Sequence, residues 1–179
     1  SVAAPHGPDG PVYPGSCRAL DPALAAARVA AGEAHAWRLD MARAVLRAGP
    51  LTWIDERLGP QAADPLGHGD IVLARRDAPA AYHLASTVDD AAMGISHVVR
   101  GADLIASTHV HRLLQALLGL PTPLYLHHRL IADADGRRLA KRHDAASITA
   151  LREGGADPAR LVADLRARVL PLGTRWIEA

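Results

Sequence analysis

Apolar and polar positions follow two different periods along the chain, and each period predicts a kind of element. Residues 108–119 carry apolar side chains at i, i+3 and i+4 spacing up to Gly119, which is typical of a helix that ends at a glycine. Short alternating or apolar runs bounded by turn residues predict strands at 34–40, 51–59, 70–76, 83–89, 97–101 and 124–131. Strand, helix, strand, loop and helix follow one another between residues 82 and 150, which predicts the parallel layer of an α/β fold.

Aspartate residues are expected to begin several of the helices. Asp21 and Asp157 each precede a proline, and this pair suits the cap and first position of a helix. Asp89 and Asp90 are expected to begin another helix, after the predicted strand at 83–89. The pattern also predicts helices at 41–49 and 147–155, and turn-rich segments at 1–16 and 60–69.

The composition limits the classes of protein that fit. A chain of 179 residues is long enough for one or two domains. A net charge of +1 excludes a strongly basic arm, and 3% aromatic residues argue against modules that stack bases on exposed rings. The single cysteine, Cys17, excludes an intramolecular disulfide and favours a cytoplasmic protein. No apolar run approaches the roughly 18 residues of a membrane span, so no membrane partner is expected. DNA is not an expected partner either.

Arg100 is a candidate ligand-binding residue because it lies near the end of an apolar strand. Open α/β sheets place their binding groups at the carboxyl ends of strands, and a guanidinium can hold a carboxylate through two hydrogen bonds. A structural ion pair with Asp103 is the alternative. Tyr82 suits either half-buried packing or a ligand-binding hydroxyl, and Asp89 and Asp90 suit either helix caps or acid/base chemistry.

Lys141 is a candidate phosphate contact. It is the only lysine among 20 basic Lys and Arg residues and lies in a polar loop. A compact ammonium on a flexible stem suits phosphates whose geometry changes during a reaction. Chance is the alternative, since one lysine must fall somewhere.

The histidine pairs do not predict a metal site. His109 and His111 are two residues apart on a predicted helix and do not share a face, while His127 and His128 point to opposite sides of a predicted strand.

Several short motifs, taken together, resemble the glutamyl-tRNA synthetase family of class I aminoacyl-tRNA synthetases. In chain order they are Tyr13-Pro-Gly-Ser-Cys17-Arg, Gly69-Asp with Arg75-Arg-Asp, Tyr82-x-Leu-Ala, Val88-Asp-Asp, Gly94-Ile-Ser-His-Val-Val-Arg100-Gly-Ala-Asp-Leu and Leu117-Leu-Gly-Leu-Pro. Residues 138–142, Arg-Leu-Ala-Lys-Arg, align with the family's second signature, usually written KMSKS. The opening motif is similar to that of a short branch of the family that lacks an anticodon-binding domain.

The resemblance implies an α/β fold made of the second half of a Rossmann-like domain, an inserted α+β acceptor-type subdomain and a helical tail. The expected division is 1–81, 82–144 with the signature loop, and 145–179. The implied activity is activation of glutamate with ATP and Mg²⁺, followed by transfer to the queuosine base of tRNA(Asp), by a monomeric enzyme. By family position, seven residues would touch a substrate or a metal ion: Tyr82 and Arg100 glutamate, Lys141, Arg138 and Arg142 ATP, and Tyr13 and Cys17 zinc.

The chain departs from the family pattern at three places. Arg138 replaces the first lysine of the signature and Ala140 replaces its serine, so a charge is kept and a hydroxyl is lost. The Cys-x-Cys that would complete the zinc site is absent, since Tyr13 and Cys17 supply at most two of four ligands. No segment matches the family's HIGH signature, which predicts that the chain is the carboxyl-terminal part of the enzyme and inactive alone. A truncated glutamyl-tRNA synthetase and a non-catalytic paralogue that binds tRNA or protein are the alternatives.

Overall fold

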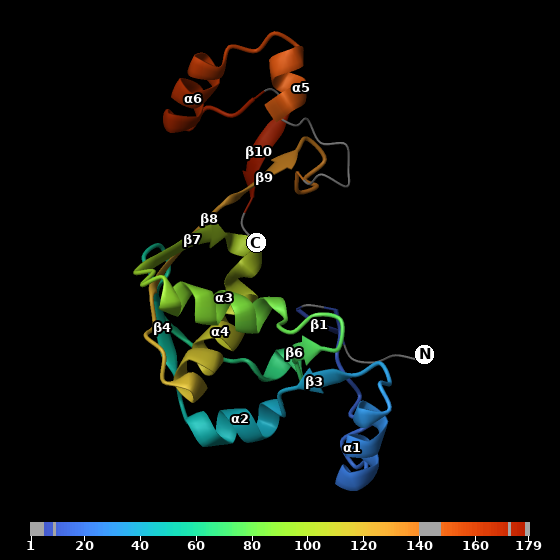
Figure 1. Ribbon diagram of the computed structural model, residues 1–179. Helices are drawn as coiled ribbons and strands as arrows, with labels where there is room; N and C mark the ends of the chain where they lie inside the picture. The colour runs from blue at the N-terminus through green and yellow to red at the C-terminus, as the bar shows by residue number, and fades with distance from the viewer. Residues whose placement is uncertain (1–5, 9, 140–147, 172, 178–179) are drawn as a thin grey trace. The chain divides into compact units, whose positions relative to one another are not determined.

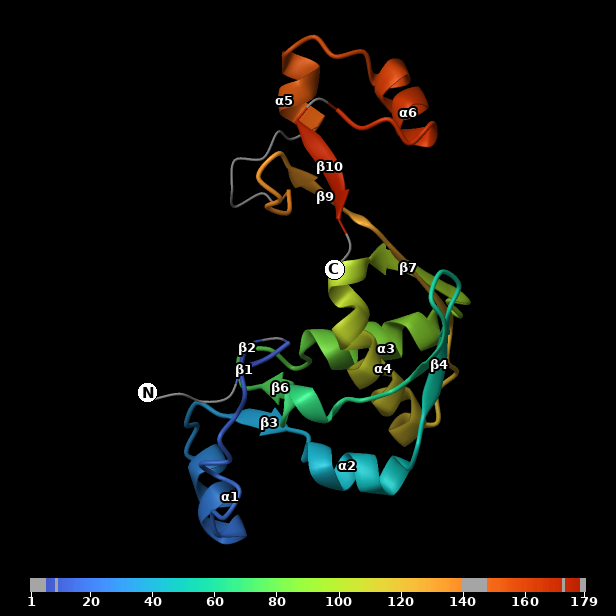
Figure 2. The ribbon, with the colours of Figure 1, turned by 180° about the vertical axis from the view of Figure 1, so that it is seen from behind.

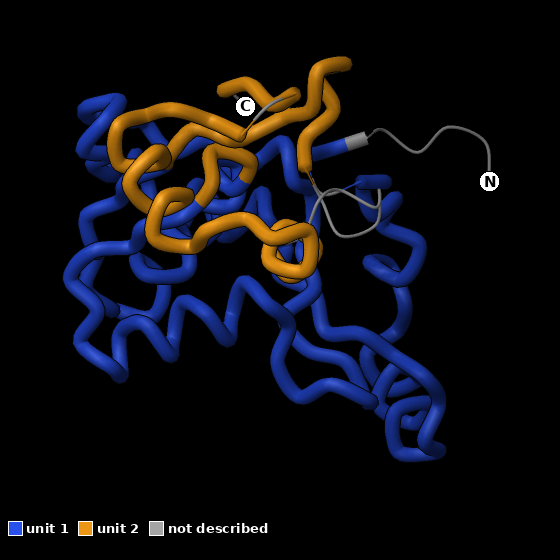
Figure 3. Tube along the Cα trace, turned by 90° about the horizontal axis from the view of Figure 1, so that it is seen from above, with its two compact units in different colours: residues 1–100, 104–127 blue, residues 101–103, 128–179 orange. Residues whose placement is uncertain are grey.

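The computed structural model describes residues 6–8, 10–139, 148–171 and 173–177 of the chain. The chain forms two compact units, which Figure 3 draws in different colours. Unit 1 comprises Ser1–Arg100 and Leu104–His127, and unit 2 comprises Gly101–Asp103 and His128–Ala179. The three-part division expected from the sequence stays a prediction.

Unit 1 holds the sheet and the larger helices (Figure 1). Its elements are β1 (His6–Gly7), β2 (Gly10–Pro11), α1 (Pro22–Ala30), β3 (Ala36–Arg38), α2 (Met41–Ala48), β4 (Thr52–Asp55), β5 (Gly59–Ala62), η1 (Leu66–His68), β6 (Val72–Arg75), α3 (Tyr82–Ala92), β7 (His97–Gly101), α4 (Ile105–Leu118) and β8 (Leu124–His128). The last residues of β7 and β8 fall in unit 2, as does the start of η2 (Ala102–Leu104).

A four-stranded mixed sheet organises unit 1. Its order is β5-β4-β8-β7, with β4 antiparallel to β5 and parallel to β8 at Asp55 and Tyr125. Side chains alternate across a strand, so Trp53 and Asp55 of β4 are buried while Thr52 and Ile54 are exposed. The mixed α/β architecture with a parallel strand pair confirms the predicted fold class.

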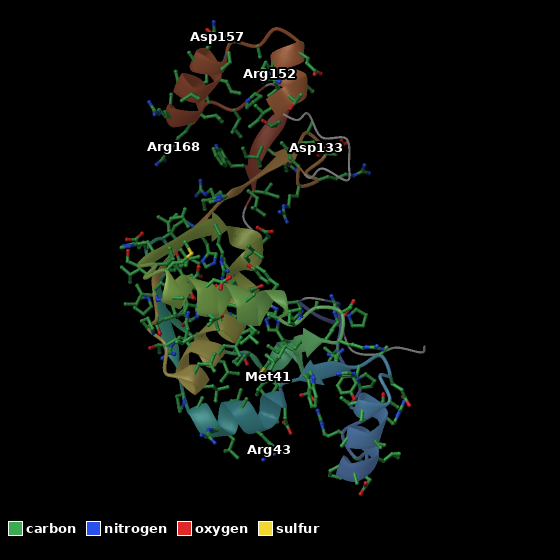
Figure 4. All side chains as sticks on the ribbon, in the orientation of Figure 1. Met41, Arg43, Asp133, Arg152, Asp157 and Arg168 are labelled. Carbon is green, nitrogen blue, oxygen red and sulfur yellow. The ribbon has the colours of Figure 1, made fainter. Side chains whose placement is uncertain are left out.

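The hydrophobic core of unit 1 lies between helices α2 and α4. It contains Met41, Ala44, Ile71, Val110, Leu113 and Leu114. Figure 4 labels Met41 on α2 and also Arg43, which lies on the exposed side of the same helix. Burial of one large aliphatic side chain contributes about 1.5–3 kcal/mol, so α4, with three of these residues, is held mainly by packing.

The sequence predicted several helix ends correctly. Asp21 caps α1 and Asp157 caps α6 (Pro158–Arg166), and in both a proline occupies the first turn. Gly119 ends α4 in a left-handed conformation with φ of 66°, which a residue with a Cβ adopts at a cost. The helices predicted at 41–49 and 147–155 appear as α2 and α5 (Ile148–Glu153).

Two predictions of local structure were wrong. Residues 83–89 form part of helix α3 rather than a strand, and Asp89 and Asp90 lie in its last turn rather than at its start. Thr87 is buried against the rest of unit 1, and its hydroxyl donates to the carbonyl of His83 at 2.8 Å, which accommodates a β-branched residue in the helix. Residues 60–69 include strand β5 and the 3₁₀ helix η1.

The described part of unit 2 contains an antiparallel strand pair and, between its two strands in the sequence, helices α5 and α6. Strands β9 (Leu130–Asp133) and β10 (Thr174–Ile177) pair antiparallel (Figure 2). In this pairing Trp176 lies opposite Ile131. The sequence pattern did not predict β10. Among the described residues of this unit only Ala102 and Ala132 are buried. No helix in the described part of the chain is long and apolar enough to cross a membrane.

Candidate functional site

Arg100, near the end of β7, lies among neutral side chains in unit 1. Its Nε donates to Nε2 of His127 at 3.1 Å, and its Nη2 donates to Oγ1 of Thr108 at 2.6 Å. Its Nη1 lies 3.3 Å from Nδ1 of His111, and its guanidinium lies 5.4 Å from the ring centre of Tyr125. These contacts fix the plane of the guanidinium from three sides.

No described carboxylate forms an ion pair with Arg100. Asp103, the partner that the sequence offered as an alternative, instead pairs with Arg138 at 2.5 Å within unit 2. Asp90 of α3 is the acid whose pKa responds to Arg100: burial raises the pKa of Asp90, and the guanidinium partly offsets this. A partly buried arginine with neutral hydrogen-bond partners retains the capacity to bind a ligand carboxylate.

His127 joins Arg100 to a buried carboxylate. The imidazole is fully buried, and its Nδ1 lies 2.6 Å from Oδ2 of Asp55. Because the guanidinium can only donate, Nε2 of His127 must accept from Arg100, and its proton therefore resides on Nδ1. Asp55 is thus connected to Arg100 through one imidazole.

Hydrogen bonds lower the pKa of Asp55, whereas burial lowers the pKa of His127. Burial opposes ionisation of Asp55, but His127 and the backbone N–H groups of Leu58 and Arg57 outweigh it and lower the pKa of the carboxyl. Burial lowers the pKa of His127, the hydrogen bond to Asp55 raises it in part, and Arg100 lowers it further. A charged Asp55 and a neutral His127 at neutral pH follow.

Two further histidines continue the connection toward Tyr82. Burial and the charge of Arg100 lower the pKa of His111 to about 3, so this ring is neutral. Nδ1 of His111 accepts from Arg100, which leaves Nε2–H to donate to Nδ1 of His83 at 3.1 Å. We call Asp55, His127, Arg100, His111 and His83 the polar chain.

Tyr82 lies at the end of the polar chain. Its ring centre is 5.4 Å from that of His83 and 5.7 Å from that of His111, and its side chain is 54% exposed. Tyr82 and Arg100, the two residues expected to contact the same substrate, therefore border the same imidazole. Helix α3 and strand β7 position them.

The residues expected to contact ATP are only partly described. Arg138 is exposed and forms the ion pair with Asp103. Lys141 and Arg142 lie outside the described residues, as does Ala140.

The expected zinc ligands do not fit a zinc ion on their own. The hydroxyl of Tyr13 accepts from the backbone N–H of Cys17 at 2.7 Å, and the guanidinium of Arg38 lies 4.4 Å from the tyrosine ring centre. The thiol of Cys17 is exposed. Within the described ranges no group of three or more His, Cys, Asp or Glu side chains is placed to hold a metal ion, whereas a structural zinc needs four ligands.

Sequence reasoning missed most of the polar chain. The pairs 109/111 and 127/128 were considered only as metal ligands, but one member of each, His111 and His127, is buried next to Arg100. A histidine two residues after Tyr125, on the same face of a strand, was the available signal. Asp55 had no local signal, because its partner is 72 residues away.

Comparison with known proteins identifies relatives over nearly the whole chain. The family model described as "tRNA synthetases class I (E and Q), catalytic domain" matches residues 6–174. The glutamyl-Q tRNA(Asp) synthetase of Rhodobacter capsulatus is 45% identical over 163 residues, which are 87% of this chain and 56% of that protein. That of Symbiobacterium thermophilum is 41% identical and covers 92% of this chain and 50% of that protein. The chain spans about half the length of these curated relatives.

Solved structures give the same picture of the fold. A glutamate tRNA ligase from Elizabethkingia meningosepticum, solved with its amino acid, matches with a TM-score of 0.57 and 26% identity, over 73% of this chain and 26% of that one. A glutamate-tRNA synthetase from Elizabethkingia anophelis at 24% identity has a TM-score of 0.58, over 83% of this chain and 30% of that one, and so shares the fold.

Proposed function

The chain belongs to the catalytic-domain family of class I tRNA synthetases for glutamate and glutamine, and from this we propose that it serves ATP-dependent activation of glutamate and transfer of glutamate to the queuosine base of tRNA(Asp). The observation that carries the proposal is Arg100, a fixed guanidinium without a carboxylate partner among the described residues. The relatives named glutamyl-Q tRNA(Asp) synthetase support the choice of tRNA.

In the proposed site Arg100 binds a carboxylate of glutamate, and Tyr82 orients the amino acid. Arg100 uses three N–H groups for Thr108, His111 and His127, so two of its five remain for a ligand. Tyr82 is exposed beside His111, where its hydroxyl is available to the same ligand.

The proposed reaction is attack by a glutamate carboxylate oxygen on the α-phosphorus of ATP. A bond forms between that oxygen and the α-phosphorus, the bond to the bridging oxygen breaks, and pyrophosphate leaves with the electron pair. The protein contributes positioning and stabilisation of charge on the phosphates. Lys141, with Arg138 and Arg142, takes the phosphate-binding role, with ATP used as its Mg²⁺ complex.

The test is L-glutamate-dependent ATP–pyrophosphate exchange by the protein as its gene encodes it, with and without tRNA. We expect exchange without tRNA, and transfer of labelled glutamate to tRNA(Asp) that contains queuosine but not to tRNA(Asp) that lacks it. Lys141→Ala should lower the exchange rate about 100-fold with little change in the KM for glutamate, because it removes charge stabilisation from the transition state.

The matched control is Arg137→Ala, which removes an exposed cation from the same segment and should leave the rate unchanged. Exchange that requires tRNA would favour an ordinary glutamyl-tRNA synthetase, the activity named for the structural relative from Elizabethkingia meningosepticum. Absence of exchange under both conditions would contradict an enzyme and leave a binding paralogue.

A further inference from the structure

Asp55 divides its two carboxylate oxygens between two tasks. Oδ1 accepts from the backbone N–H groups of Arg57 and Leu58, both at 2.9 Å, and so holds the turn between β4 and β5. Oδ2 accepts from the backbone N–H of His127 at 3.2 Å and from its Nδ1 at 2.6 Å. The two oxygens can therefore be tested separately.

We propose that Asp55 is a positioning residue for substrate carboxylate binding: through Oδ2 it fixes the tautomer of His127, and His127 in turn fixes Arg100. This inference rests on the proposed function, because it takes Arg100 as the residue that binds glutamate. Asp55 itself is fully buried, and its hydrogen bonds are to His127 and to the turn after β4 rather than to the guanidinium.

The tautomer follows from the chemistry of the groups on either side. A charged Asp55 can only accept, so it keeps the imidazole proton on Nδ1. Nε2 then presents a lone pair to Nε–H of Arg100 at 3.1 Å. With the proton on Nε2 instead, two N–H donors would face each other, and the guanidinium would have to turn away from His127.

The orientation of Arg100 matters because the remaining donors form a directional pair. Thr108 and His111 hold Nη2 and Nη1, and His127 holds Nε. Loss of the His127 contact leaves the guanidinium without a partner at Nε, held only by its two Nη contacts. A bidentate contact with a carboxylate depends on that orientation, so the loss should fall on glutamate binding.

Asp55→Asn is the informative substitution. With Oδ1 retained at the turn, the amide nitrogen replaces Oδ2 and presents a donor to both Nδ1–H and the backbone N–H of His127. We expect the KM for L-glutamate in ATP–pyrophosphate exchange to rise about 10-fold to 100-fold, because a hydrogen bond to a charged group is lost, while kcat and the KM for ATP change less than about twofold. The assay uses the protein as its gene encodes it.

The matched control is Asp70→Asn in the same protein. Asp70 is also buried and accepts from a backbone N–H, that of Met41 at 3.0 Å, and from Arg18 at 2.5 Å. Within the described part of the chain, Asp70 forms no hydrogen bond with a residue of the polar chain, so the KM of the Asp70→Asn variant for glutamate should stay unchanged. An equal rise in both variants would assign the effect to general destabilisation and overturn the inference.

A spectroscopic measurement tests the tautomer in the native protein itself, and a variant is needed only to assign the signal. Long-range ¹H–¹⁵N correlation spectra of the ¹⁵N-histidine-labelled native protein should show His127, assigned by loss of its signal in His127→Gln, with its proton on Nδ1. A native His127 protonated on Nε2 would overturn the inference. In folded Asp55→Asn the proton should move to Nε2.

Arg100→Lys separates failure of this inference from failure of the proposed function. A lysine keeps the charge and loses the bidentate geometry, so the KM for glutamate should rise at least as much as in Asp55→Asn. If Arg100→Lys leaves that KM unchanged, Arg100 does not bind glutamate and the proposed site is wrong. If Arg100→Lys raises it and Asp55→Asn does not, only the positioning role is wrong.

Discussion

The two units differ in where they place their polar groups. Among its described residues, unit 1 buries two aspartates, Asp55 and Asp70, and three histidines, His68, His111 and His127. Unit 2 buries only two alanines among its described residues, and its ion pairs, Arg138 with Asp103 and Arg160 with Asp164, involve exposed arginines. A buried polar network in which every group is hydrogen-bonded fixes the orientation of its side chains, whereas an exposed ion pair contributes little to orientation or stability.

This difference agrees with the tasks that we propose for the two units. An amino-acid carboxylate must be bound at one fixed angle, which suits Arg100 with its three neutral partners. Phosphates change geometry during adenylate formation, which suits cations that are not fixed in a buried network, such as Arg138. The contrast predicts that equal substitutions will have unequal effects in the two units.

A pair of tryptophans gives the largest expected contrast. Trp53 of β4 is 2% exposed and packs edge-on against Tyr125 and His127, whereas Trp176 of β10 is 40% exposed. Trp53→Ala should lower the free energy of unfolding by about 3–5 kcal/mol, because it leaves a cavity in a core. Trp176→Ala should cost about 1 kcal/mol, because less area is buried. Urea denaturation followed by circular dichroism measures both.

If Trp53→Ala and Trp176→Ala lowered the free energy of unfolding equally, the proposed difference between the two units would be contradicted. Trp53→Phe adds a further check: Nε1 of Trp53 is a buried donor without a partner in the described part of the structure. Trp53→Phe removes this donor and keeps an aromatic ring, so it should lower the free energy of unfolding less than Trp53→Ala does.

Acid should destabilise unit 1 through His111. Its folded-state pKa of about 3 lies below the ordinary value of 6.5, so the unfolded chain binds more protons between these values. The stability from the neutral ring is complete above about pH 6.5 and is lost as the pH falls toward 3. At pH 4.5, two pH units below the ordinary value, the loss from this ring should be about 3 kcal/mol. Unfolding free energies measured from pH 7 to pH 4.5 test this.

His111→Gln should flatten this pH dependence, because glutamine does not titrate. His128→Gln, a substitution of an exposed histidine, is the control and should keep the slope of the native protein. An unchanged slope in His111→Gln would mean that His111 does not supply the dependence, and would leave the buried His127, whose pKa is also lowered, as the source.

The sequence predicted what local signals encode. Asp21 as a cap, Gly119 as a helix end and Arg100 near the end of a strand each depend on a few neighbouring residues. The contact between Asp55 and His127 depends instead on parallel pairing of β4 with β8, and no local rule fixes that register. The roles assigned to Tyr82, Arg100 and Lys141 from family position stay predictions.

Helix α3 is an element for which local propensity predicted the wrong structure. Its residues His83 to Asp89 include Thr87 and Val88, which suit a strand by propensity. Packing against α4 requires a face with helical period, and tertiary contact overrides a weak local preference. The misplacement of Asp89 and Asp90 followed from this single error.

The smallest expected effect concerns the exposed ion pair of unit 2. Asp103→Asn removes the charge that faces Arg138, whose side chain is 52% exposed. An exposed pair contributes less than about 1 kcal/mol and is screened by salt, so the cost should be small and should vanish in about 1 M NaCl. The same change at Asp55 should cost more at both salt concentrations, because it leaves buried donors facing each other. Urea denaturation of the two variants at low and high salt measures the difference. A salt-independent cost at Asp103 as large as that at Asp55 would mean that unit 2 also holds its charges in a buried network, and the contrast between the units would fail.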